Sequence, residues 1–325
     1  MKRIFAIFSC AVFAVSCTKT SSTEEVIKPE ETIGAPAALR ACASEEVLAA
    51  NLLADPGLAA RMAAIEEVTD RFAANGGAQN YTSNGIVYIP VVVNVLYKTA
   101  AENVSQAQIQ SQIDVLNADF SGTNSDISQV PAVFTGVKAG DVGVRFVLDQ
   151  VIRKATTKTS WRTDDAMKKS SRGGIDPTSP STKMNMWACT MGGGILGYAQ
   201  FPGGSLATDG IVITNTAFGV TTAGAPYNKG RTGTHEVGHY LNLRHIWGDA
   251  TCGNDFVGDT PLHNGANYGC PVANKTSTCS GNPVMQTMNY MDYTDDLCMY
   301  MFSAGQKTRL NATFAAGGGR TSLAL

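Results

Sequence analysis

The sequence predicts a mixed α/β or α+β domain in which helices cover a twisted, mixed sheet. The run IVYIPVVVNVLY at 86–97 is rich in β-branched residues and favours a buried strand over a short helix. Residues 105–120 repeat apolar side chains every three or four positions behind Ser105, a suitable helix N-cap. Further strand candidates lie between Gly-, Pro-, Ser- and Asp-rich clusters at 142–153, 183–191 and 209–218. This order of elements is typical of a layered fold.

Two helices are expected before this sheet. Ser44 can cap the first, Asp55 and Pro56 can begin the second, and the glycines after Asn75 can end it. We therefore divide the chain after its first 36 residues into a helical segment, 37–79, and a main domain, 80–325.

The N-terminus has the pattern of an export signal. Lys2 and Arg3 precede an apolar run that is too short to cross a bilayer. The residues before Cys17 resemble a lipobox, which predicts a lipoprotein signal peptide at 1–16 and lipidation of Cys17. Ordinary signal cleavage is the alternative. Residues 17–36, rich in Ser, Thr, Glu and Pro, are expected to form a tether. In either case the protein is expected to be exported, to the cell envelope or to the medium.

Composition limits the partners. The formal net charge is -2, with a pI near 6.1, so the chain lacks the basic surface that binds nucleic acid or an anionic membrane. A lipid anchor is the expected membrane contact. Four cysteines lie between 252 and 298, and in an oxidising compartment they indicate two disulfides with three alternative pairings.

A metal-binding motif occupies residues 234–245. His235 and His239 lie one turn apart on one helical face, and Glu236 can act on a water molecule beside a zinc ion held there. A straight helix would carry His245 too far away to be the third ligand, so the chain must turn back. Asn242 stands where such motifs usually have glycine, and Asn tolerates the left-handed conformation best among other residues. His263 is expected to be structural.

Five stretches of sequence are distinctive: HEVGHYLNLRHIWGD, the Asp-Thr-Pro of 259–261, the Gly-Cys-Pro of 269–271, NYMDYTDD and FSAGQ. Together they resemble the pappalysin, or cytophagalysin, family of metzincin zinc peptidases. The resemblance implies a metzincin-like domain with two long helices above a zinc cleft and a loop-rich, disulfide-bonded lower subdomain.

The resemblance also implies roles for individual residues. One zinc ion would have three ligands, His235, His239 and His245. Glu236 would be the general base and acid, Tyr293 would donate to the developing oxyanion, and Met291 would form the Met-turn below the metal. A buried structural role is the alternative for Tyr293. The family's crosswise pairing would join Cys252 to Cys279 and Cys270 to Cys298, and a calcium ion would bind Asp255, Asp259 and Thr260.

Substrate binding and latency follow from the same resemblance. The glycine-rich segment 192–204 would be an edge strand that pairs with an extended substrate. Asp295 and Asp296 would line a pocket that favours Arg or Lys after the scissile bond. Cys42 would be a fourth zinc ligand that keeps the precursor inactive, and an unpaired or lipid-proximal cysteine is the alternative. Activation would then cut the chain between Arg61 and Tyr81, with Arg71 as a candidate site of autolysis.

The function predicted is that of a monomeric, latent zinc endopeptidase acting on proteins or peptides. A non-catalytic zinc-containing surface lipoprotein that acts as a binding module is one alternative, and a hydrolase of non-protein amides is another. Cys189 is expected to be a buried strand thiol.

Overall fold

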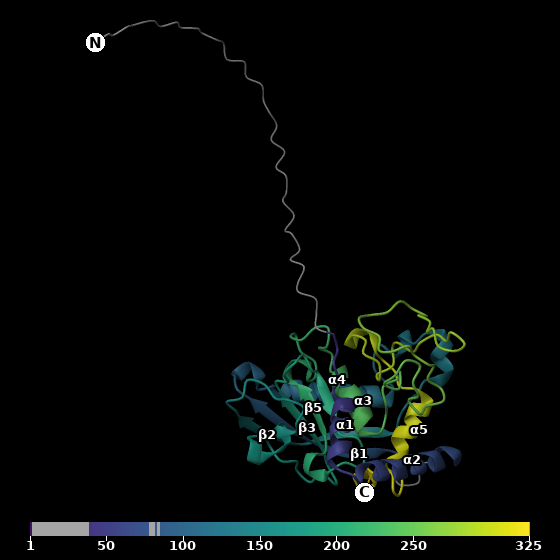
Figure 1. Ribbon diagram of the computed structural model, residues 1–325, viewed down its shortest axis with the longest axis horizontal. Helices are drawn as coiled ribbons and strands as arrows, with labels where there is room; N and C mark the ends of the chain where they lie inside the picture. The colour runs from purple at the N-terminus through teal and green to yellow at the C-terminus, as the bar shows by residue number, and fades with distance from the viewer. Residues whose placement is uncertain (2–38, 78–81, 83–84, 325) are drawn as a thin grey trace. The chain divides into compact units, whose positions relative to one another are not determined.

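The computed structural model describes residue 1, residues 39–77, residue 82 and residues 85–324. The chain divides into two units, Met1–Pro36 and Ala37–Leu325. Apart from Met1, the predicted signal peptide and tether, with Cys17, lie outside the described residues. In the second unit, the strands and the helices α3 and α4 lie beside a loop-rich segment coloured yellow-green in Figure 1. Each described helix is too short or too polar to cross a membrane.

The strands form one mixed sheet in the order β2-β1-β3-β5-β4. The two edge strands differ, because β2 pairs in parallel with β1, whereas β4 pairs antiparallel with β5. The bounds of the strands are β1 Val87–Tyr97, β2 Val144–Ala155, β3 Met184–Cys189, β4 Gly197–Ala199 and β5 Ile211–Thr214. The mixed α/β fold predicted from the sequence is therefore confirmed.

Five α-helices belong to the described residues: α1 Ser44–Ala54, α2 Leu58–Ala74, α3 Gln106–Ser121, α4 Arg231–Tyr240 and α5 Ala304–Ala312. Short 3-10 helices lie between them at Ala100–Glu102, Ile127–Gln129, Ala132–Val137, Ala166–Lys168, Ser170–Arg172, Leu206–Thr208, Asn215–Ala217, Asp296–Cys298 and Thr321–Ala324. Ser105 caps α3 as expected, since its side chain accepts a hydrogen bond from the Gln108 amide.

Ser44 does not cap α1 as the sequence suggested. Ala43 occupies the N-cap position, and Ser44 is the first helical residue. Its hydroxyl accepts a hydrogen bond from the Ala199 amide and donates one to Glu236 Oε2. The hydroxyl is thus engaged by the main domain and not by its own helix.

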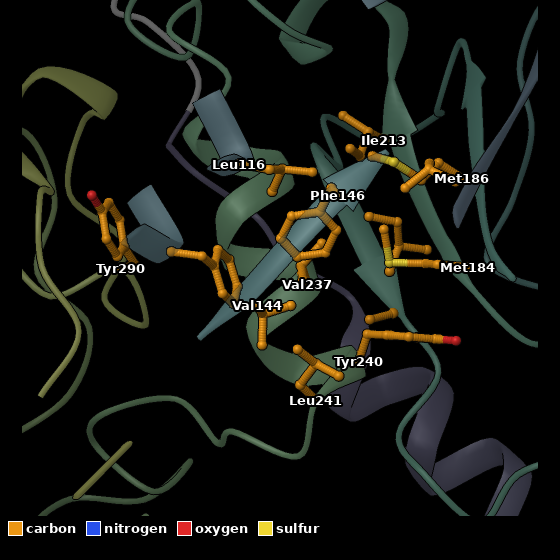
Figure 2. Packing of buried hydrophobic residues seen from close by; sticks show 14 of the residues in the cluster. Leu116, Val144, Phe146, Met184, Met186, Ile213, Val237, Tyr240, Leu241 and Tyr290 are labelled. Atoms are coloured by element: carbon orange, nitrogen blue, oxygen red, sulfur yellow. The ribbon is translucent and has the colours of Figure 1, made fainter. Parts of the chain in front are cut away.

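The main hydrophobic core lies between the sheet and the helices α3 and α4. Figure 2 shows Phe146 of β2 among Leu116 of α3, Val144 of β2 and Val237 of α4. A second buried cluster contains residues of the sheet, such as Trp187 and Val212, and also Ala43 and Val47 from the N-terminal helical segment. That segment is therefore packed into the domain.

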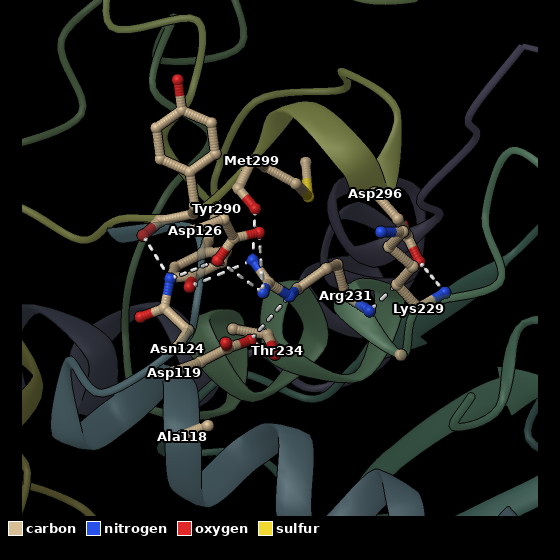
Figure 3. A network of polar contacts seen from close by, with 12 residues as sticks. Ala118, Asp119, Asn124, Asp126, Lys229, Arg231, Thr234, Tyr290, Asp296 and Met299 are labelled. Atoms are coloured by element: carbon tan, nitrogen blue, oxygen red, sulfur yellow. Dashed lines mark hydrogen bonds and ion pairs between the residues drawn. The ribbon is translucent and has the colours of Figure 1, made fainter. Parts of the chain in front are cut away.

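A polar network fixes the start of α4. The Arg231 guanidinium contacts Asp119 of α3, with Nε 3.2 Å from Oδ2, and also Asp126, with Nη2 3.1 Å from Oδ1 (Figure 3). It also donates to the carbonyl of Met299. Asp119 in turn accepts a hydrogen bond from Thr234, one residue before the motif histidine. The orientation of α4 is thus tied to α3 and to the C-terminal loops.

The loop-rich segment is joined by two disulfides, Cys252–Cys279 and Cys270–Cys298. This is the crosswise pairing that the resemblance implied among three alternatives. The bridges link the residues after the metal-binding motif to the segment that carries Met291 and Tyr293.

Candidate metal centre

Helix α4 carries the first two histidines on one face, and their Nδ1 atoms are held by backbone carbonyls. His235 Nδ1 lies 2.7 Å from the Tyr290 oxygen, and His239 Nδ1 lies 2.8 Å from the Leu243 oxygen. Each carbonyl can only accept a hydrogen bond, so each Nδ1 carries the proton and each Nε2 keeps a lone pair for a cation.

Asn242 turns the chain after α4. Its φ of 72° lies in the left-handed region, which ends the helix and returns the backbone toward the metal-binding face. His245 then comes back beside the two helical histidines. Its Nδ1 is bound to Asp249, a carboxylate four residues further along the chain.

The three histidines converge through their Nε2 atoms. His239 Nε2 lies 3.2 Å from His235 Nε2 and 3.2 Å from His245 Nε2. Tetrahedral zinc with Zn–N bonds of about 2.1 Å needs ligand nitrogens about 3.4 Å apart, so this set fits zinc. Burial lowers the pKa of His245 to about 3 and that of the other two well below 6.5. Neutral imidazoles are the form that binds metal.

Cys42 completes a four-membered cluster of candidate ligands with His235, His239 and His245, whose ligand atoms all lie within 4.8 Å of one another. The segment around it pairs with the edge of the sheet at β4: the Leu196 amide donates to the Ala41 carbonyl, and the Ala43 amide donates to the Gly197 carbonyl. This pairing runs parallel to β4. An isolated parallel bridge to Gly197 therefore places Cys42 beside the histidines.

Glu236, next to His235 on α4, is fully buried. Burial raises the pKa of its carboxyl to about 8. Its Oε2 accepts hydrogen bonds from Ser44 Oγ at 3.1 Å and Cys42 Sγ at 3.5 Å, while Oε1 has no partner among the described residues. A Cβ on Gly197 would lie 2.9 Å from that Oε1, so glycine is needed where β4 passes the carboxylate.

Tyr293 and Met291 lie below the histidines on the loop that follows Tyr290. The Tyr293 ring centroid lies 4.9 Å from that of His245, and its hydroxyl donates to the Cys42 carbonyl. Met291 is fully buried, and its sulfur contacts the backbone of Gly238 in α4. Both side chains therefore lie close to the three histidines.

The two candidate specificity acids differ in their surroundings. Asp296 is buried and forms an ion pair with Arg40, and it also accepts from the amides of Lys229 and Arg231. Asp295 is half-buried, and burial raises the pKa of its carboxyl. The structure therefore brings Asp296, rather than Asp295, into direct contact with a basic side chain.

The three candidate calcium ligands do not share one environment. Thr260 Oγ1 donates to Asp255, whose carboxyl pKa burial raises to about 6. Asp259 instead accepts from Ser303 Oγ and the Gly305 amide at the start of α5. Asp259 thus has a structural role in holding that helix.

Two further residues have the structural surroundings expected of them. His263 is buried, and its Nε2 accepts a hydrogen bond from the Gln286 amide. Cys189 is a buried free thiol on β3.

Comparison with known proteins assigns the chain to a family. The sequence model described as Pregnancy-associated plasma protein-A, of the Peptidase_M43 family, matches residues 187–315. An extracellular metalloprotease of Colletotrichum graminicola is 32% identical over 270 residues, which are 77% of this chain and 86% of that protein. The chain belongs to the pappalysin family of zinc metallopeptidases.

Solved structures from Tannerella forsythia agree with this assignment. Mature mirolysin in complex with a cleaved peptide is 40% identical, with a TM-score of 0.71 over 74% of this chain and 96% of that one. A mutant of promirolysin is 37% identical, with a TM-score of 0.79 over 88% of this chain and 97% of that one. This pappalysin is therefore a metalloendopeptidase, and the alternative of a non-catalytic binding module loses its support.

Sequence reasoning missed several residues of this pappalysin's cleft. Arg40 precedes Cys42 by two positions, yet only the cysteine was interpreted. Ser44 resembles a helix cap in the sequence, whereas its hydroxyl contacts Glu236. Asp249 follows His245 by four residues, and the usual need of a ligating histidine for a carboxylate or carbonyl partner could have found it. Gly197 gave no signal apart from the glycine-rich segment around it.

Proposed function

We propose that this chain is the latent precursor of an exported zinc endopeptidase that cleaves peptide bonds before Arg or Lys, and that residues 37–79 are its inhibitory prosegment. The observation that carries the proposal is the path of the prosegment through the cleft. Arg40 forms an ion pair with Asp296, and two residues later Cys42 lies among the three histidines. One short segment thus covers both a basic-side-chain pocket and the metal ligands.

In the proposed reaction, His235, His239 and His245 hold the zinc ion through Nε2. Zinc bound there supplies a Lewis acid for the scissile carbonyl and lowers the pKa of a water molecule. Glu236 takes a proton on its carboxylate and returns it to the leaving amine. Tyr293 donates its hydroxyl proton in a hydrogen bond to the carbonyl oxygen as negative charge develops.

Met291 and Asn242 have positioning roles in this proposal. The Met291 side chain fills the space beneath α4 against Gly238 and keeps the two helical histidines in place. Asn242 allows the backbone to reverse so that His245 completes the ligand set.

Latency would come from the same contacts. Cys42 supplies a fourth ligand position, and Ser44 donates to Glu236, so both the metal and the base are engaged. Removal of the segment would free β4 for an extended substrate. The side chain after the scissile bond would then replace Arg40 against Asp296, which is why we expect a preference for Arg or Lys. Arg71, exposed on α2, is a proposed site of autolysis.

Export and accessory features complete the proposal. The similarity to proteins named extracellular metalloproteases supports action outside the cytoplasm. We further propose lipidation at Cys17, a monomeric protein, and a structural calcium ion with Asp255, Asp259 and Thr260 as its ligands.

Cleavage of matched peptides tests the proposed preference. Peptides that differ only in Arg, Lys or Gln after the scissile bond are given to the processed protein and to its Asp296→Asn and Asp295→Asn variants. We expect the wild type and Asp295→Asn to prefer Arg and Lys over Gln, and Asp296→Asn to lose that preference. Equal cleavage of the three peptides by the wild type would contradict the proposal.

A further inference from the structure

A second charged contact between the prosegment and the cleft lies beyond Cys42. Glu45 of α1 accepts a hydrogen bond from Arg244, with its Oε1 3.1 Å from Nη1. Arg244 immediately precedes the ligand His245. Arg40 and Glu45 precede and follow Cys42 in one continuous segment, so the Asp296 contact and the Arg244 contact lie on either side of Cys42 along the prosegment.

The Arg244 guanidinium is held in place independently of Glu45. Its Cζ lies 4.3 Å from the ring centroid of Phe201, in a cation–π arrangement. Phe201 follows β4 and its ring centroid lies 5.3 Å from that of His239. A guanidinium fixed beside a ligand histidine is preorganised to bind a carboxylate.

Removal of the prosegment would leave this guanidinium with unused donors. In the precursor, Glu45 is its hydrogen-bond partner among the described residues, and Nε is buried without a partner there. Asp249 also interacts electrostatically with Arg244, but its carboxylate is bound to His245 Nδ1. Phe201 would at the same time lose its apolar prosegment neighbours Leu48 and Leu58. The exposed surface would thus combine an apolar ring with an unpaired positive charge.

We propose that Arg244 and Phe201 form a substrate subsite for glutamate on the N-terminal side of the scissile bond, and that Glu45 occupies it in the precursor. This inference rests on the proposed function, in which the side chain after the scissile bond lies at Asp296. The prosegment runs parallel to β4, whereas a substrate would run antiparallel to it. The carboxylate of Glu45 and that of the substrate glutamate would therefore occupy the same position, while the two backbones run in opposite directions. The methylene groups of glutamate can lie on the ring while its carboxylate reaches the guanidinium.

The test compares isosteric peptides, with Glu or Gln at each of the three positions before a scissile bond that is followed by Arg. We expect the processed wild type to cleave the Glu peptide about five- to tenfold better in kcat/KM at one of these positions, as for a partly exposed charge-assisted hydrogen bond. The Glu/Gln ratio should fall as salt concentration rises.

Variants assign the preference to one side chain. Arg244→Gln should bring the Glu/Gln ratio close to 1, and Arg244→Lys should keep it above 1. Arg145→Gln is the matched control and should keep the wild-type ratio. Arg145 pairs with Asp141 and lies on β2, at the edge of the sheet opposite to β4. Equal cleavage of the Glu and Gln peptides by the wild type would overturn the subsite alone. Failure to cleave any peptide would overturn the proposed function, and the subsite with it.

Discussion

The sulfur of Met291 lies directly against the backbone of Gly238, in the turn of α4 between the two helical histidines. A Cβ on Gly238 would overlap that sulfur, so the helix can approach the Met-turn this closely because it has no side chain there. The distance between α4 and the loop that carries Tyr293 is set by this contact. The geometry of the metal centre therefore depends on the contact between Gly238 and Met291 as well as on the ligands themselves.

Replacement of Gly238 by alanine should displace Met291 and disturb the histidines. Alanine favours a helix over glycine by about 1 kcal/mol, but overpacking of a buried site costs about 1–3 kcal/mol. We expect a lower melting temperature and a kcat/KM reduced by about 10- to 100-fold. Gly136→Ala, at a site with open space, is the control. Wild-type activity in Gly238→Ala would argue against this role.

Loss of the Tyr293 hydroxyl should affect the chemical step more than substrate binding. Tyr293→Phe is expected to lower kcat by about 10²- to 10³-fold with little change in KM, because the hydrogen bond strengthens as charge develops on the substrate oxygen. Steady-state kinetics on the processed protein measure this. Tyr268→Phe, whose ring lies 5.9 Å from that of Tyr293, is the control. An unchanged kcat would leave Tyr293 with a structural role.

The second prosegment helix is anchored by Glu66. Its carboxylate accepts two hydrogen bonds from Arg309 of α5, at 2.6 and 2.7 Å, and a third from the Asn242 amide group at 3.3 Å. Glu66→Gln should weaken this docking and speed self-processing several-fold, which mass spectrometry of the N-terminus over time can follow. The adjacent Glu67→Gln changes an exposed residue and should process at the wild-type rate. Equal rates for all three proteins would exclude Glu66 as an anchor.

Asp119, in the network of Figure 3, should make stability depend on pH. Burial raises the pKa of its carboxyl from 3.8 to about 6. A raised folded-state pKa means that the folded protein binds the proton more tightly, so this stabilisation is complete below pH 3.8 and is lost as the pH rises through 6.

Asp119→Asn removes this dependence. The free energy of unfolding of the wild type, minus that of the variant, should decrease by about 3 kcal/mol from pH 3.5 to pH 7. Urea unfolding at several pH values measures the difference. A constant difference would contradict the raised pKa.

The sequence predicted the elements whose local signals are strong. The β-branched run became β1, Ser105 caps α3, and Asn242 could be recognised as the turn because the motif requires a reversal before His245. Other features depend on tertiary packing. Ser44 is a residue type that often caps helices, but its hydroxyl donates a hydrogen bond to Glu236, 192 residues away.

Long-range ion pairs could not be predicted from the sequence either. Arg40 meets Asp296 and Glu45 meets Arg244 across separations that no local pattern encodes. Of the two adjacent acids at 295 and 296, the structure distinguishes the one that is buried beside the amides of Lys229 and Arg231. Those amides belong to a segment about 65 residues earlier in the chain.

The most direct test of the account measures zinc content and peptide cleavage together, in the wild type and in Glu236→Ala. Limited proteolysis first removes the prosegment from each of the two proteins. We predict about one zinc per chain in both proteins. Only the wild type should cut peptides, with activity lost on chelation and restored by zinc. Cleavage by Glu236→Ala, or a wild type that holds one zinc and cuts nothing, would contradict the assignment of this cleft as the catalytic centre.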